Sequence, residues 1–321
     1  METALQNAPF LRREKKTVHI MGDVLIALMP VSVMAVVMFG LRSLLLMVIS
    51  VATCVFLEFI TQRIMKRPST VYDLSACVTG LLIGLSFPVV TPIWLIVFAD
   101  FVAIVFIKQL PGGLGRNVFN PAVFARVLSK VLFTPFFTNW VSPLPDMTST
   151  ATPLSMIGNG MESVPAGAPS LYQVFMGNIG GNMGETVKWA IILGFLYLSV
   201  RKVINPLIPL ATLVGLFLTT LLFGGTDPYF ALYHVLTGTA MFASVFMVTD
   251  YTSGPLHTTG RIYYALIIGI LTGILRYVFN LPGGIGIAIL IMNMFSPFMD
   301  KITEPRAYGE KLFADNVYQR R

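Results

Sequence analysis

Ten long apolar segments run through the sequence and limit its fold more than any other feature. A helix that spans a membrane needs about 20 mostly apolar residues, with a range of about 17–25. Eight of the ten segments fit this length well, whereas 74–90 is short and 118–137 contains two cations, Arg126 and Lys130. The pattern predicts an all-α, polytopic membrane protein with ten transmembrane helices. The segments are 23–41, 43–61, 74–90, 91–108, 118–137, 187–204, 206–224, 229–249, 262–280 and 284–299.

The composition excludes a soluble or a disordered chain. Apolar residues make up 55% and charged residues 12% of the 321 positions, against roughly 45–50% and about 25% in soluble domains. So few charges cannot cover a soluble surface, whereas a bilayer requires no charged surface. The two cysteines, Cys54 and Cys77, both lie in apolar runs. Neither a disulfide framework nor a cysteine-ligated cluster is therefore predicted.

The distribution of Lys and Arg predicts the orientation in the membrane. If the N-terminus is cytoplasmic and 118–137 counts as a crossing, most basic residues fall in cytoplasmic loops and Arg42 and Lys188 fall outside, as the positive-inside rule expects. The net charge of +7 then reports topology, so we expect the lipid bilayer, and not nucleic acid, as a partner. Both termini are predicted to be cytoplasmic and the long loop 138–186 extracytoplasmic. The cytoplasmic basic residues are Arg12, Arg13, Lys15, Lys16, Arg63, Lys66, Arg67, Lys108, Arg116, Arg201, Lys202, Arg261 and those of the tail from Lys301 to Arg321.

Two short motifs occur twice in the sequence. LPGGLG at 110–115 returns as LPGGIG at 281–286, and Val-Thr-Gly at 78–80 returns as Leu-Thr-Gly at 236–238. Each half then holds five spans, and an odd number turns the second half upside down. Inverted repeats of this kind place a pathway or binding site at their interface, whereas two tight turns are the simpler alternative. The predicted divisions are a cytoplasmic segment 1–22, a first membrane repeat 23–137, the extracytoplasmic loop 138–186, a second membrane repeat 187–300 and a cytoplasmic basic tail 301–321.

Ionisable groups inside the predicted spans are candidates for function, because each costs at least ~2.5–3.5 kcal/mol on insertion scales. Asp100 lies in the middle of 91–108, and it is either half of a buried structural pair or part of an ion path. Glu58 and Arg276 can pair or reach an interface, and the lone His234 is expected to pack or hydrogen-bond. The sequence contains no zinc-type cluster, phosphate loop or GxSxG motif. Neither a metal site nor a catalytic set is predicted.

The loop 138–186 carries the motif that points to function. DMTSTATPL at 146–154 resembles the covalent flavinylation motif of the Nqr/Rnf family of membrane flavoproteins. Further stretches that resemble the same family are GGLGRNVFNPA at 112–122, FMVTD at 246–250 with SGP at 253–255, and ILIMNMFSPFMD at 289–300. The resemblance covers nearly the whole chain, from residue 20 to residue 302.

This resemblance implies that the Thr152 hydroxyl is linked to FMN by a phosphoester bond. Thr150 stands where the family motif usually has glycine, and it adds a second hydroxyl close by. Attachment at Thr150 or Thr148 is therefore the alternative. The role of Thr152 would be anchoring, since the isoalloxazine ring supplies the redox chemistry. The rest of the attachment motif is matched by Asp146, Ser149, Ala151 and Pro153, of which Asp146 is expected either to be recognised by the attaching enzyme or to cap a helix.

The short segment before the first span matches the Rnf branch of the family better than the Nqr branch. The resemblance then implies a membrane subunit of a translocase complex that couples electron flow between ferredoxin and NAD to movement of Na⁺ or H⁺. It implies partner subunits of the A, B, C, E and G types, a separate flavin-attaching enzyme, a second, non-covalent riboflavin and a prokaryotic cell (inner) membrane location. The alternatives are the B subunit of a Na⁺-translocating NADH:quinone oxidoreductase, an inverted-repeat transporter, and a scaffold without a redox role.

Overall fold

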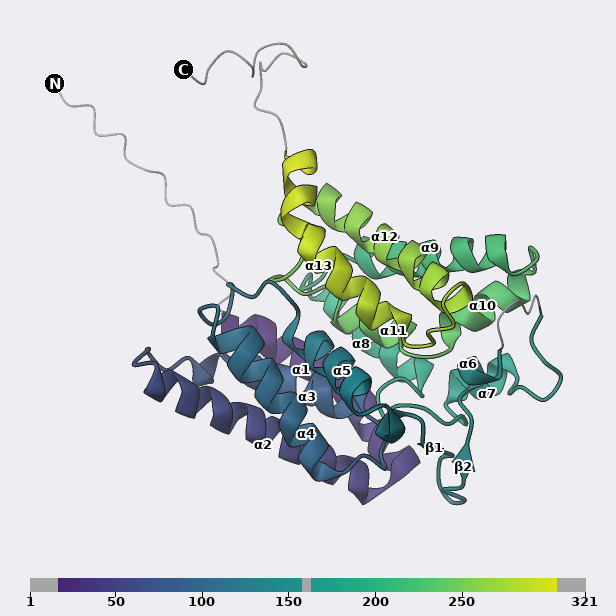
Figure 1. The fold of residues 1–321 in the computed structure, drawn as a ribbon, viewed down its shortest axis with the longest axis horizontal. Helices are drawn as coiled ribbons and strands as arrows, with labels where there is room; N and C mark the ends of the chain where they lie inside the picture. Colours follow the sequence, from purple (N-terminus) through teal and green to yellow (C-terminus); the bar gives the residue numbers. More distant parts are fainter. Residues whose placement is uncertain (1–16, 158–162, 305–321) are drawn as a thin grey trace, which may run out of the picture.

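The computed structural model describes residues 17–157 and 163–304, and within these ranges the chain is largely helical (Figure 1). The first half forms α1 (Thr17–Phe39), α2 (Leu41–Ile64), the 3₁₀ turn η1 (Val71–Asp73), α3 (Ser75–Ser86), α4 (Ile93–Phe101), the π-helical η2 (Val102–Gln109) and α5 (Pro121–Leu132). The connecting segment forms η3 (Thr134–Phe137), β1 (Trp140–Val141), β2 (Ser149–Thr150), α6 (Pro153–Met156) and α7 (Leu171–Met176). The second half forms α8 (Lys188–Val200), α9 (Leu207–Phe223), α10 (Pro228–Leu236), α11 (Ala240–Phe246), α12 (Thr258–Tyr277) and α13 (Gly284–Thr303).

Each of the ten predicted apolar segments contains a helix. In the described part of the chain, α1, α2, α12 and α13 are long and apolar enough to cross a membrane. α10 and α11 are bent by 58° at the break between them and add a fifth span if they count as one. α3, α8 and α9 are apolar but shorter, and α4 continues directly into η2. The chain is therefore a multi-pass membrane protein.

The outer face of α1 has the surface expected of a helix in lipid. Ile26, Met29, Val33 and Val37 are each more than half exposed. Their spacing of three and four residues places them in one stripe along the helix. A continuous exposed apolar stripe is unfavourable in water but favourable against acyl chains.

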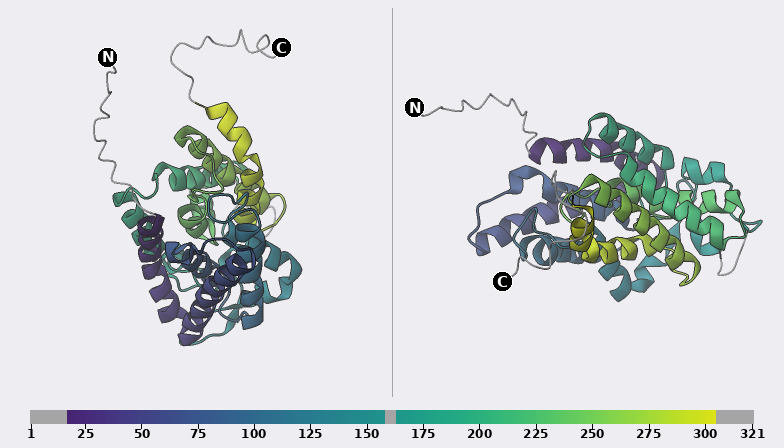
Figure 2. Two further views of the ribbon diagram at one scale, coloured as in Figure 1. Left: turned by 90° about the vertical axis from the view of Figure 1, so that its left-hand side faces the viewer. Right: turned by 90° about the horizontal axis from the view of Figure 1, so that it is seen from above.

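The helices of the two halves form two groups that pack together (Figures 1 and 2). α1 packs against α8, and α5 packs against α13, so the contact between the halves uses the first and last helices of the first half. Within the second half, α9 and α12 approach closely at Gly215 and Gly269, where a Cβ on either glycine would collide with the backbone of the other helix. Small residues allow this close approach in membranes, where packing replaces the hydrophobic effect.

The connections between helices gather at two ends of the bundle. At one end, the Leu256 N–H donates to Asp300, which joins the α11–α12 loop to the last turns of α13. At the other, the Leu144 N–H donates to the Met38 carbonyl, which joins the loop after β1 to the end of α1. β1, β2, α6 and α7 lie together at this second end (Figure 1). We call the end that holds the α11–α12 loop the terminal end, and the end that holds β1 and β2 the hairpin end.

Two cations that were expected outside the membrane core, Lys108 and Lys188, lie inside the bundle. Lys108 is 1% exposed and its Nζ lies 2.9 Å from the carboxylate of Glu58, which is completely buried. The expectation that Glu58 can pair is confirmed, whereas the placement of Lys108 in a loop was wrong. Lys188, expected outside, is completely buried, and Arg276 is buried and donates to two backbone carbonyls at the end of α10. These cations are retained inside because a carboxylate or backbone carbonyl oxygens accept their hydrogen bonds.

Candidate cofactor cavities

Thr152 is presented by a small hairpin at the hairpin end. Trp140 of β1 pairs with Thr150 of β2, and Thr152 follows directly as the N-cap of α6. Its hydroxyl accepts a hydrogen bond from the Ser155 N–H at 3.2 Å and donates to Ser155 Oγ at 3.0 Å. Pro153 occupies the first helical position, which suits its fixed φ and missing N–H. The Thr152 side chain is half-buried, so its oxygen is held in place and still accessible.

Thr152 opens onto a large cavity, which we call the hairpin-end cavity. It encloses about 1170 Å³, its open mouth included. α5, the β1–β2 hairpin, the segment before α8, the α10–α11 break and the second Pro-Gly-Gly motif all contribute to its walls. The second copies of both repeated motifs thus lie beside Thr152. Among the lining residues are Arg126, Lys130, Trp140, Thr152, Glu185 and Pro282.

The structure separates the predicted motif residues into two groups. Ala151 and Pro153 line the hairpin-end cavity together with Thr152. Asp146 and Ser149 are exposed and lie outside the lining. Thr150, the alternative hydroxyl, also lies outside it, and its side chain packs near Gly180. Of these hydroxyls, that of Thr152 faces the cavity.

Positive charge surrounds this cavity. Arg126 and Lys130 lie one turn apart on α5, and Arg126 Nη2 donates to Thr239 Oγ1 at 3.3 Å. The Lys130 ammonium lies so close to Gly283 that a Cβ there would be 2.8 Å from Nζ. Glu185 Oε2 is 4.0 Å from Arg126 Nη2. Among the described residues that line the cavity, Glu185 is the only acid beside two cations, which favours a further negative group in the cavity.

Aromatic side chains provide the apolar part of the same wall. Phe137 and Trp140 line the cavity next to Thr152. Flat rings bind other ring systems by offset or edge contacts. A hydroxyl, two cations and two aromatic rings are the groups that would attach, neutralise and pack a phosphorylated ring system. These residues fit the FMN expected at Thr152.

Asp100 lies away from this cavity, among α2, α3 and α4. It is completely buried, and its Oδ1 accepts a hydrogen bond from Ser50 Oγ at 2.7 Å. The same hydroxyl lies 2.7 Å from the Gly80 carbonyl oxygen. Asp100 Oδ2 has no hydrogen-bond partner within the described residues. A buried carboxylate oxygen without a partner is uncommon and fits either a protonated acid or a site for a cation.

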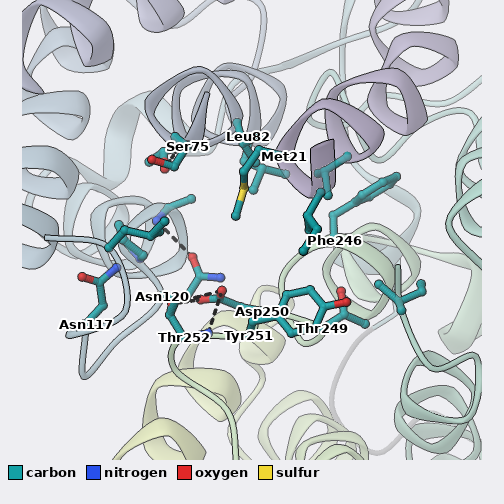
Figure 3. A pocket seen from close by; sticks show the side chains of 18 of the residues that line it. Met21, Ser75, Leu82, Asn117, Asn120, Phe246, Thr249, Asp250, Tyr251 and Thr252 are labelled. Atoms are coloured by element: carbon teal, nitrogen blue, oxygen red, sulfur yellow. Dashed lines mark hydrogen bonds between the residues drawn. The ribbon is translucent and has the colours of Figure 1, made fainter. Parts of the chain in front are cut away.

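A second cavity lies at the terminal end and encloses about 730 Å³, its mouth included (Figure 3). Two stretches that resemble the flavoprotein family meet here, one in the segment before α5 and one after α11. Asn120 joins them, because its Oδ1 caps the N-terminus of α5 while its Nδ2 donates to the Met247 carbonyl at 3.2 Å. We call this space the terminal-end cavity.

The terminal-end cavity is lined by both amide and apolar groups. Asn117 lines it, and its side-chain oxygen is buried without a partner in the described part of the chain. Asp250 accepts hydrogen bonds from Thr252 and thereby fixes the loop at the cavity wall. Met21 and Phe246 face the same space (Figure 3). Polar groups placed on a largely apolar wall are typical of a small-molecule site.

Sequence reasoning named no residues for a second flavin. The available signal was the position of two family-like stretches, one in each half of the chain, whose proximity is visible only in the fold. Within the residues that the structure describes, no three His, Cys, Asp or Glu side chains gather as a metal site.

The fold and the two cavities define the class of this chain. It is a multi-pass membrane protein whose helix bundle carries a partly polar cavity at each end. Residues 4–309 match the model of the NQR2, RnfD, RnfE family. The chain belongs to this family.

Named relatives match the chain over almost its whole length. The D subunit of the Na⁺-translocating ferredoxin:NAD⁺ oxidoreductase complex of Acetobacterium woodii is 36% identical, with 96% of each chain covered. The D subunit of the proton-translocating ferredoxin:NAD⁺ oxidoreductase complex of Clostridium ljungdahlii is 32% identical, with 96% of each covered. The D subunit of an ion-translocating oxidoreductase complex of Pseudomonas aeruginosa is 33% identical, with 95% of each covered.

Proposed function

We propose that this chain is the D-type membrane subunit of an Rnf-type complex, an ion-translocating ferredoxin:NAD⁺ oxidoreductase. The names of its relatives and the nearly complete coverage of both chains support this assignment. The partners would be subunits of the A, B, C, E and G types and a separate flavin-attaching enzyme. One of these relatives is named for Na⁺ translocation and another, of similar identity, for proton translocation. Sequence identity therefore does not decide which ion this complex would move.

We infer ten crossings, arranged as inverted repeats at 23–137 and 187–300. The connection after α1 lies at the hairpin end and the connection before α12 at the terminal end, as alternating crossings require. The packing of α1 on α8 and of α5 on α13 supports a two-fold relation between the halves. With the positive-inside rule, the terminal end is cytoplasmic and the hairpin end is extracytoplasmic, in a prokaryotic cell membrane.

The observation that carries the flavin assignment is the position of Thr152 on the hairpin-end cavity. Its hydroxyl would form the phosphoester with FMN, which accepts and returns electrons when bound. Arg126 and Lys130 would lie beside the ester, and Trp140 beside the ring. Asp146, on the exposed turn of the hairpin, is accessible to an attaching enzyme.

The terminal-end cavity is the candidate site for riboflavin. It brings Asn117 and Asn120 of the first half against Asp250 of the second. Each cavity takes one copy of the repeated motifs: Thr79 and Leu114 line the terminal-end cavity, whereas the second copies line the other. A two-fold relation between the halves would place one such cavity at each face of the membrane.

The two cavities are close to one another. On α5, Asn120 lines the terminal-end cavity and Arg126 lines the hairpin-end cavity. Six residues of helix correspond to about 9 Å at about 1.5 Å per residue. On α11, Thr239 and Val245 line the same two cavities and are also six residues apart. On both helices the lining residues of the two cavities are therefore less than two turns apart, which would favour direct electron transfer between the bound groups.

Fluorescence of the flavin on a denaturing gel tests this assignment. The protein is produced with the attaching enzyme, and a fluorescent band is expected at its mass. Thr152→Ala should abolish the band, because it removes the motif hydroxyl that faces the cavity. Thr150→Ala is the matched control and should retain the band, since Thr150 lies outside the cavity.

The same gel separates the alternatives. A band that persists in Thr152→Ala and disappears in Thr150→Ala or Thr148→Ala would move the attachment to that residue. A wild-type protein without a band would favour a transporter or a scaffold without a redox role.

A further inference from the structure

Four buried or half-buried cations gather around a single carboxylate at the hairpin end. Glu185 interacts electrostatically with Arg126, Lys130, Lys188 and Arg276. Lys188 is completely buried, and Glu185 and Arg276 are 6% and 5% exposed. Like charges in a medium of low dielectric repel one another strongly. The described residues therefore leave an excess of positive charge at this site.

Two of the four cations are held by backbone oxygen atoms. Lys188 Nζ donates to the Glu185 backbone carbonyl. Arg276 donates to the carbonyls of His234 and Thr237, which are at the negative end of α10. These bonds fix both cations inside the bundle, outside the cavity lining, and leave their formal charge in place.

The other two cations face the hairpin-end cavity. Arg126 has a hydroxyl at 3.3 Å and a carboxylate oxygen at 4.0 Å as its polar neighbours. The Glu185 carboxylate is itself already occupied, because it accepts from the N–H and the side-chain amide of Asn182 at 3.1 and 2.9 Å. Within the described residues, no hydrogen bond or ion pair involves the Lys130 ammonium. Both groups thus retain donors for an anion.

We propose, on the basis of the flavin attachment at Thr152, that Arg126 and Lys130 bind the phosphate of the phosphoester, while Lys188 and Arg276 keep its surroundings positive. Arg126, Lys130 and Thr152 line one cavity. A phosphoester that joins two groups keeps one negative charge, and Arg and Lys bind it with charge-assisted hydrogen bonds. Arg126 and Lys130 therefore act as positioning residues, and the bound phosphate stabilises the cation cluster.

A comparison of loaded and unloaded protein tests this proposal without an activity measurement. Each variant is produced with and without the attaching enzyme, loading is measured by gel fluorescence, and the melting temperature is measured in detergent. Loaded wild-type protein is expected to melt at a higher temperature than unloaded. We call the difference between the two melting temperatures the gap. In Lys130→Gln and in Arg126→Gln the gap should shrink, because the loaded form loses a phosphate contact while the unloaded form loses a repulsion between cations.

Conservative and distant variants are the controls. Lys130→Arg and Arg126→Lys should restore the gap because they keep the charge. Arg42→Gln should leave it unchanged, since Arg42 donates to the Val89 carbonyl and lies outside the cavity.

Two results would overturn the proposal, and they are distinguishable. A fluorescent wild-type band combined with equal losses of stability in loaded and unloaded Lys130→Gln and Arg126→Gln would show a purely structural role. A wild-type protein without a band would overturn the flavin assignment itself, and the gel alone would reveal it. A gap that shrinks only in the charge-removing variants supports the phosphate site.

Discussion

Removal of the Lys108 charge should strongly destabilise the helix bundle. Lys108 Nζ lies 2.9 and 3.0 Å from the two carboxylate oxygens of Glu58 and 2.6 Å from Ser75 Oγ. Lys108→Met would leave the buried carboxylate without its cation, a change that typically costs about 3–5 kcal/mol. Gln62 and Gln109 still donate to Glu58 Oε1, at 3.2 and 2.8 Å. We therefore expect the lower value, about 3 kcal/mol.

The double variant Lys108→Met with Glu58→Gln should be much more stable than the single one. It removes both charges and keeps a side chain of similar shape, and replacement of a whole buried pair is often neutral. Equilibrium unfolding in detergent micelles measures the free energies of unfolding for a double-mutant cycle. Arg63→Gln, an exposed change on the helix that carries Glu58, is the control, and its free energy of unfolding should stay within about 0.5 kcal/mol of that of the wild type. A loss below about 1 kcal/mol in Lys108→Met, or an equal loss in the double variant, would refute the reasoning.

Two further predictions concern ion movement and the proposed second flavin. Asp100→Asn should lower the number of ions pumped per electron in the assembled complex, because it removes a buried carboxylate whose Oδ2 has no partner in the described ranges. Unchanged pumping at a normal rate of electron transfer would show that the role of Asp100 is only structural. Asn117→Ala should reduce the non-covalent flavin released on denaturation while the covalent band persists, since its amide lines the terminal-end cavity. Asn205→Ala, outside both cavities, should retain both flavins, and an equal loss in the two variants would contradict this site.

The helices could be predicted because the signal for them is local. Every apolar segment contains a helix, and α1 and α13 extend beyond the predicted segments by one or two turns that mix apolar residues with polar or charged ones such as His19 and Lys301. The break between α10 and α11 was not predicted, although Thr-Gly-Thr at this point contains a glycine with φ of +66°. Glycine adopts such a φ without strain, so the chain can bend here inside an otherwise apolar run.

The positions of the charges could not be predicted in the same way. Lys108 was assigned to a loop because it ends an apolar segment, yet its partner Glu58 lies 50 positions away and on another helix. Counting basic residues per loop treats each as solvated. A cation at a helix end can instead turn into the bundle when another helix presents a carboxylate to it.

The sequence by itself determined that this chain lies in a membrane, which segments form helices and which hydroxyl stands in the stretch that resembles a flavin-attachment motif. These properties depend on neighbouring residues, through hydropathy and through short motifs. Only the tertiary structure decided that Thr152 shares a cavity with Arg126 and Lys130. It also decided that one carboxylate, that of Glu185, interacts electrostatically with four cations. These groups come from four separate parts of the chain, and their electrostatic interaction depends on distance and burial, which the packing of the helices sets.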